Sequence, residues 1–252
     1  MNVAVIVTCL IGLLIFLIAC AVLVKEIFEP ARRHQLKVCC KKYKTTPAKF
    51  VSQMYNEIPD CLIRPIHITY LSTYNGKCTR FRRHIIISSD YMIRFYEENY
   101  SSVLEDYSLC LCYGHEIAHY FYPQKKKIPL SKPNSIVRIM REVKADIDGK
   151  CFFGISQEQA YRCFVQEKKI QKKNRWLFKL GTHPDWDDRC TYILEYPEYN
   201  AELEERIKRD YCQKLKCPYS KVAGLTLLDD NNKTQEVLEK LRKTRQITHK
   251  SL

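Results

Sequence analysis

The chain has 252 residues and a formal net charge of +14; 46% of its residues are hydrophobic and 28% are charged, as in an ordinary globular domain. Its 13 cysteines have no regular spacing, which argues against a disulfide framework and favours a reducing compartment. The chain lacks zinc-finger spacing, an RNP-like aromatic pattern and a helix-turn-helix signal, so nucleic acid is not an expected partner. A basic surface beside an anionic membrane accounts for the charge more simply.

An uninterrupted apolar run covers residues 3–24 and contains no charged side chain. As a helix, about 22 residues reach about 33 Å, which is enough to cross the bilayer core. Basic residues follow the run and none precedes it, so we expect the N-terminus outside and the rest of the chain in the cytoplasm. The sequence therefore predicts a transmembrane anchor at 1–25 in the cell membrane and a basic juxtamembrane linker at 26–45, which can also contact anionic lipid headgroups.

Two other interpretations of the N-terminus were weighed. Residues 17–20 resemble a bacterial lipobox, in which Cys20 would carry the lipid, and a cleaved secretory signal is the second alternative. Both require basic residues before the apolar run, and the run also continues past Cys20 to Val24. An uncleaved single-pass anchor is the preferred interpretation.

The next segment predicts a mixture of helices and short strands. Residues 46–58 form an amphipathic pattern that begins at Thr46-Pro47. The runs 66–71 and 82–87 have strand character, and Asn75-Gly76 between them predicts a hairpin. Ser88-Ser89-Asp90 offers an N-cap for a helix over 91–98. Farther along, helices are expected at 102–122, 134–153, 157–165, 202–215 and 235–247.

The helix at 102–122 contains His115-Glu116-Ile117-Ala118-His119, an H-E-x-x-H pattern. Histidines four residues apart lie on one face of a helix, so both imidazoles can bind one metal ion. Glu116 lies beside that face and can take a proton from a water molecule at the metal. The alternative is a chance match in a partly buried helix. Cys112, one turn before His115, was considered as a fourth ligand.

The following helix offers a third ligand. Glu142 and Asp146 are four residues apart, so a carboxylate can complete a site of two histidines and one acid, and the aspartate can accept the other ring N–H of a ligating histidine. Asp148 lies on a different face and suits neither role. A solvated acidic helix edge is the alternative interpretation.

Together, H-E-x-x-H and E-x-x-x-D on a following helix resemble the gluzincin zinc metallopeptidases. The strand ending at 85–89 is similar to their active-site sheet, and the Thr-His-Pro-x4-Arg element at 182–189 is similar to that of membrane-associated peptidases of this kind. The resemblance covers residues 46–196. It implies zinc as cofactor, with these roles: metal ligands His115, His119 and Glu142; general base Glu116; Asp146 orienting His115; His183 and Arg189 near the cleft.

A histidine or arginine near the cleft can stabilise the oxyanion formed when water attacks an amide. The alternative is local: Thr182 would cap a helix that has Pro184 in its first turn. The chain differs from the membrane-associated peptidases in having one apolar span instead of several, so their lipid-linked substrates are not carried over.

The predicted fold class is α+β: a mainly helical, zincin-like metallopeptidase domain with a small β-sheet at 46–200, preceded by one N-terminal transmembrane helix and followed by a charged helical extension at 201–252. The predicted function is a membrane-anchored zinc-dependent endopeptidase acting on a protein or peptide. Two alternatives remain: a membrane-tethered adaptor with a structural zinc site, and a basic membrane-surface protein without metal.

Overall fold

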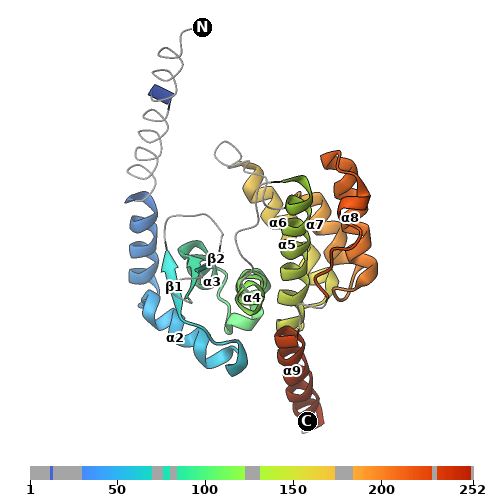
Figure 1. Ribbon diagram of the computed structural model, residues 1–252. Helices are drawn as coiled ribbons and strands as arrows, with labels where there is room; N and C mark the ends of the chain where they lie inside the picture. Colours follow the sequence, from blue (N-terminus) through green and yellow to red (C-terminus); the bar gives the residue numbers. More distant parts are fainter. Residues whose placement is uncertain are drawn as a thin grey trace.

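The computed structural model describes residues 12–13, 30–69, 76–79, 84–122, 131–173, 184–228 and 232–250. Helices dominate these segments and accompany one small sheet, so the prediction of a mainly helical α+β fold is confirmed (Figure 1). The labelled helices are α2 (Pro47–Glu57), α3 (Ser89–Glu97), α4 (Tyr107–Phe121), α5 (Lys132–Phe153), α6 (Gln157–Lys173), α7 (Trp186–Glu195), α8 (Ala201–Leu215) and α9 (Asn232–Lys250).

Within the described ranges, no helix combines the length and apolar character needed to cross a bilayer. The predicted span at 3–24 lies outside these ranges except for Gly12 and Leu13. The transmembrane anchor therefore stays a prediction from the sequence.

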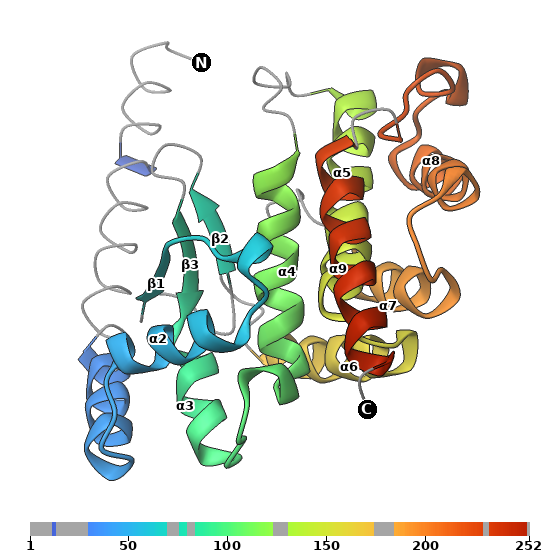
Figure 2. The same cartoon turned by 90° about the horizontal axis from the view of Figure 1, so that it is seen from below.

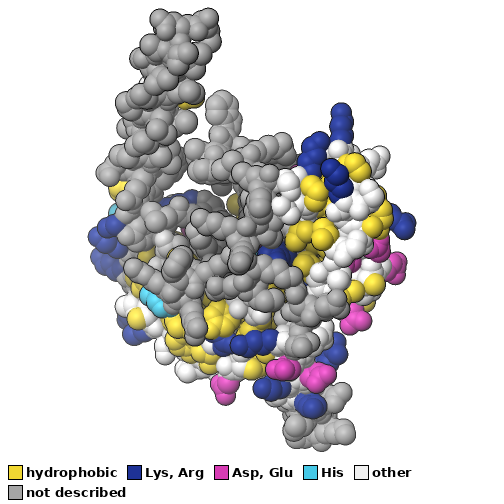
Figure 3. Space-filling model, in the orientation of Figure 1, with side chains coloured by type: hydrophobic (Ala, Val, Ile, Leu, Met, Phe, Trp, Pro, Cys, Tyr) yellow, Lys and Arg dark blue, Asp and Glu magenta, His cyan; other side chains and the backbone are white. Residues whose placement is uncertain are grey.

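Residues 30–42, in the predicted juxtamembrane linker, are helical. This basic helix is anchored on α3: Arg32 lies 4.0 Å from Asp90, and the Tyr43 ring that follows the helix stacks on Tyr96 with centroids 5.5 Å apart. Dark-blue cationic side chains gather at the edge of the molecule where this helix lies (Figure 3). The exposed cations of this helix are Arg33, Lys37, Lys41 and Lys42, and Lys44 directly after it is exposed as well.

The sheet has three strands in the order β1-β3-β2, with bounds β1 (Ile66–Thr69), β2 (Gly76–Thr79) and β3 (His84–Ser88). The predicted hairpin between the runs 66–71 and 82–87 is wrong, because β1 and β3 pair in parallel. Gly76 begins an additional strand, β2, which pairs antiparallel with the other edge of β3. The apolar β3 takes the central position, where Ile85 and Ile87 are fully buried.

Local sequence signals set most helix ends. Thr46 caps α2 and Ser88, one of the three residues predicted to offer a cap there, caps α3, each through its side-chain oxygen. Ser102 caps a short 3-10 turn instead of the motif helix, so α4 begins after Asp106, whose side chain accepts a hydrogen bond from the Leu109 amide. Gly154 ends α5 in the left-handed conformation, with φ of 66°.

Buried residues form two clusters. The sheet-side core joins the sheet to α2, α3 and most of the buried face of α4, with Phe50, Ile85 and Ile117 as members. The helical core joins α5, α6, α7 and α8, with Ile136, Ile193 and Leu203 as members. α9 adds Val237 and Leu241 to the sheet-side core, and helix α4 lies between the sheet and α5 (Figure 2).

Helices α4 and α5 touch through their backbones at two glycines. A Cβ atom built on Gly149 would lie 2.6 Å from the amide nitrogen of His115, and one built on Gly114 would lie 2.6 Å from the carbonyl oxygen of Gly149. Real Cβ atoms do not approach other atoms so closely, so only glycine fits at these two positions in the observed packing. Gly149 follows Asp146 by three residues and Glu142 by seven, on the same helical face. The contact therefore brings that face against the first histidine.

Candidate metal centre

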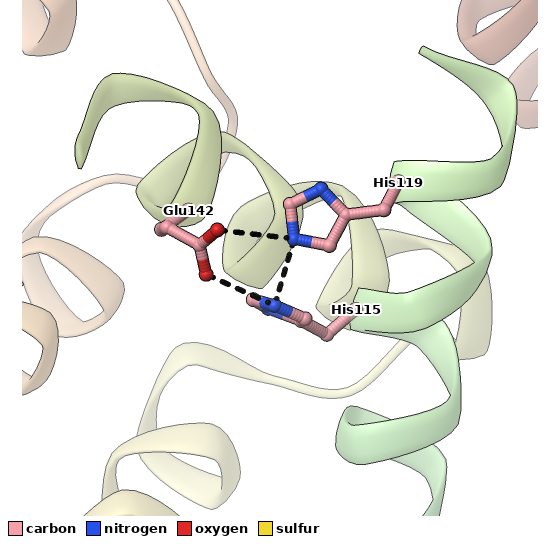
Figure 4. A group of neighbouring side chains, drawn as sticks. All are labelled: His115, His119 and Glu142. Atoms are coloured by element: carbon pink, nitrogen blue, oxygen red, sulfur yellow. Dashed lines mark hydrogen bonds and ion pairs between the residues drawn. The ribbon is translucent and has the colours of Figure 1, made fainter. Parts of the chain in front are cut away.

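Three potential ligands from two helices converge (Figure 4). The Nε2 atoms of His115 and His119 are 3.0 Å apart; Glu142 Oε2 lies 3.4 Å from His115 Nε2, and Glu142 Oε1 lies 3.5 Å from His119 Nε2. Tetrahedral zinc with bonds of about 2.0–2.1 Å holds its ligand atoms about 3.3 Å apart. These separations and the two-imidazole, one-carboxylate chemistry both fit a zinc ion; that the residues bind one stays a prediction.

Asp146 orients the first histidine. His115 Nδ1 donates to Asp146 Oδ1 over 2.8 Å, and the aspartate is almost fully buried. An ionised carboxylate can only accept a hydrogen bond, so the ring proton belongs on Nδ1 and the lone pair of Nε2 faces His119 and Glu142. This is the arrangement that commonly supports a metal-ligating histidine.

Arg189 from α7 holds Asp146 in turn. Its Nε donates to Asp146 Oδ2 over 2.8 Å and its Nη2 donates to Oδ1 over 2.6 Å. The guanidinium also lies over the rings of Trp186 and Phe164, with centroid distances of 4.2 and 4.8 Å. Two of its donors thus serve Asp146, which favours a supporting role over the predicted contact with an oxyanion.

The charges around Asp146 explain its ionisation. Burial alone would raise the pKa of its carboxyl, but the charge of Arg189 and the hydrogen bond from His115 outweigh that effect and lower the pKa. For His115, burial would lower the pKa, yet the hydrogen bonds and charges of Asp146 and Glu142 raise it to about 10. A proton and a metal cation therefore compete for the same Nε2.

Glu116 lies between the two histidines on α4 and is 9% exposed. Its charge acts on the Cys112 thiol, whose pKa is raised mainly by burial and further by Glu116. A thiol must ionise to bind metal, which burial here opposes. Within the described part of the chain, the only ligand group contains His115, His119 and Glu142, so Cys112 is not a fourth member.

The Thr-His-Pro-x4-Arg element is only partly visible. His183 and Thr182 lie outside the described residues, so the predicted role of His183 stays a prediction. The alternative in which Thr182 caps a helix with Pro184 in its first turn is wrong, because α7 begins at Trp186 after Asp185.

Sequence reasoning missed two features of this centre. The first is the Gly114–Gly149 contact, which sets the distance between the ligand-bearing helices. Its sequence signal is a pair of glycines: one directly before His115 and one on the next helix, seven residues after Glu142. The pairing of Arg189 with Asp146 joins residues 43 positions apart and had no signal beyond the Thr-His-Pro-x4-Arg element itself.

Comparison of the chain with models of protein families, with curated proteins and with solved structures finds no match, so the resemblance to the gluzincins stays a prediction.

Proposed function

We propose that this protein is a zinc-dependent endopeptidase. The observation that carries the proposal is the convergence of His115 Nε2, His119 Nε2 and the Glu142 carboxylate within 3.0–3.5 Å of one another. The described residues supply three ligands, the number typical of catalytic zinc sites, whereas structural sites usually have four. This difference favours a peptidase over an adaptor with a structural zinc.

Each residue has a role in the proposed reaction. His115, His119 and Glu142 hold the ion; Asp146 keeps the proton of His115 on Nδ1, and Arg189 keeps Asp146 ionised and in place. When bound, zinc supplies a Lewis acid that polarises a peptide carbonyl and lowers the pKa of water. Glu116 accepts the proton of the attacking water and returns it to the leaving amine.

The basic helix that packs on α3 is consistent with the same activity at a membrane. If residues 1–25 anchor the chain as predicted, the basic helix at 30–42 would lie next to anionic headgroups and hold the peptidase domain at the cytoplasmic face. Its substrate would then be a protein or peptide within reach of that surface.

Two variants test the proposal. Glu116→Gln should keep stoichiometric zinc and lose cleavage, because the amide cannot accept the proton. Glu142→Gln should lose zinc, because a neutral amide replaces an anionic ligand. Zinc is measured by metal analysis of the purified full-length chain, and cleavage by proteome-wide profiling of N-termini in cells that express each form. New termini that appear equally with wild type and Glu116→Gln would refute the assignment of Glu116.

A further inference from the structure

The two histidines of α4 are oriented in different ways. His115 donates its Nδ1 proton to Asp146, whereas the described residues offer no hydrogen-bond partner to Nδ1 of His119. Instead, the His119 ring packs edge-to-face against Tyr122, with centroids 5.7 Å apart and an interplanar angle of 86°. Aromatic pairs of this geometry attract each other beyond simple burial. Two rings thus pack edge-to-face against His119: that of His115, with its centroid 4.6 Å away, and that of Tyr122.

A buried ion pair holds Tyr122. Its hydroxyl donates to Asp148 Oδ2 over 2.9 Å, and the same oxygen accepts from Lys144 Nζ over 2.6 Å. Lys144 Nζ also lies 5.2 Å from the centre of the Tyr122 ring. Lys144 and Asp148 are 2% and 3% exposed, and a pair so deeply buried needs further hydrogen bonds to offset its desolvation. The Tyr122 hydroxyl provides one, so the tyrosine and the ion pair fix each other.

We propose that Tyr122, fixed by Asp148 and Lys144, is a positioning residue that sets the ring orientation of His119 for metal binding; this inference rests on the proposed function. Two acids of α5 then orient the two histidines of α4. Asp146 acts on His115 directly, and Asp148 acts on His119 through the tyrosine ring. Asp148 thereby gains a role although it lies outside the ligand group.

The test is a Co²⁺ titration of the full-length chain in three forms: wild type, Tyr122→Phe and Tyr113→Phe. Tyr122→Phe removes only the hydroxyl and keeps both the ring and the Lys144–Asp148 pair. Tyr113 is the control, because it is a fully buried tyrosine of α4, the helix that ends just before Tyr122, and its hydroxyl donates to the Leu62 carbonyl over 2.9 Å, within the sheet-side core. Co²⁺ reports both affinity and, through its visible absorption, the geometry of its ligands.

We expect Tyr122→Phe to bind Co²⁺ about tenfold more weakly, at the low end for residues that support metal ligands, with a changed absorption spectrum. Tyr113→Phe should keep the affinity and spectrum of wild type. Wild-type behaviour of Tyr122→Phe, or an equal loss in Tyr113→Phe, would overturn the inference.

If Tyr122→Phe does not fold, the double variant Lys144→Met, Asp148→Leu takes its place, since both charges leave together and the tyrosine ring loses its anchor. It should show the same weaker binding, and wild-type affinity in this variant would overturn the inference. Failure of the proposed function would appear differently, as a wild-type chain that binds Co²⁺ but generates the same N-termini as Glu116→Gln.

Discussion

The close contact between α4 and α5 makes Gly149→Ala the most informative substitution. The added methyl would lie 2.6 Å from the His115 amide nitrogen and 2.7 Å from the Gly114 carbonyl carbon. Ordinary contacts of this kind are about 3.5–4.0 Å, so the helices must separate by about 1 Å. Overpacking of this kind costs about 1–3 kcal/mol, while alanine recovers about 1 kcal/mol of helix propensity. We expect a net loss of about 1 kcal/mol in the free energy of unfolding.

The effect on the metal centre should be larger than the effect on stability. Glu142 is now 3.4 Å from His115 Nε2, and ligands need to stay within about 0.5 Å of their productive positions. A shift of about 1 Å should therefore weaken zinc binding by about 10–100-fold, the loss seen when the support of a metal ligand is disturbed. Urea unfolding gives the first quantity, and competition with a chelator gives the second, both on the full-length chain.

Gly224→Ala is the control, because a Cβ at Gly224 would meet nothing within 4 Å. It should leave both quantities at their wild-type values. If Gly149→Ala bound zinc as tightly as wild type, the backbone contact would not be what sets the distance between the ligands.

Two further predictions concern the residues behind the ligands. Asp146→Asn should weaken zinc binding by about 10–100-fold, because His115 loses an ionised acceptor. Arg189→Lys should give a smaller loss, because one donor group replaces two. Chelator competition measures both affinities, and a larger loss in Arg189→Lys than in Asp146→Asn would contradict this order. Burial raises the pKa of Glu167 to about 7 from its ordinary 4.5, so the folded chain binds this proton more tightly than the unfolded chain does. The free energy of unfolding should therefore fall as pH rises from about 4.5 to about 7, by at most about 3 kcal/mol, since Glu167 is only half-buried. Urea unfolding across this range should show a shallower fall for Glu167→Gln, and an unchanged slope would refute the assignment.

The features of this fold that could be predicted from the sequence are those determined by residues only a few positions apart. Thr46, Ser88 and Gly154 mark helix ends because a cap acts on amides or carbonyls within a few positions. The four-residue spacing of His115 and His119 gives a shared face for the same reason. Each of these signals depends on backbone geometry alone.

What could not be predicted depends on which distant segments meet. The strands β1 and β3 pair in parallel and β2 pairs with the other edge of β3, and no turn residue encodes that order. The apolar spacing predicts a helix from 102, whereas residues 103–105 form a separate 3-10 turn capped by Ser102 and α4 begins at Tyr107. Arg189 reaches Asp146 only because α7 packs beside α5, and the residue pattern within either helix does not show that the two helices meet.

The ligand group lies where the two cores meet, and this has a consequence for the lifetime of the protein. Helix α4 belongs mainly to the sheet-side core and α5 mainly to the helical core, so a cation held by both would act as a removable cross-link between the halves. A ligand that binds only the folded state stabilises it in proportion to the logarithm of its free concentration. If the site binds zinc as proposed, cellular zinc supply would then govern how long the chain escapes proteolysis.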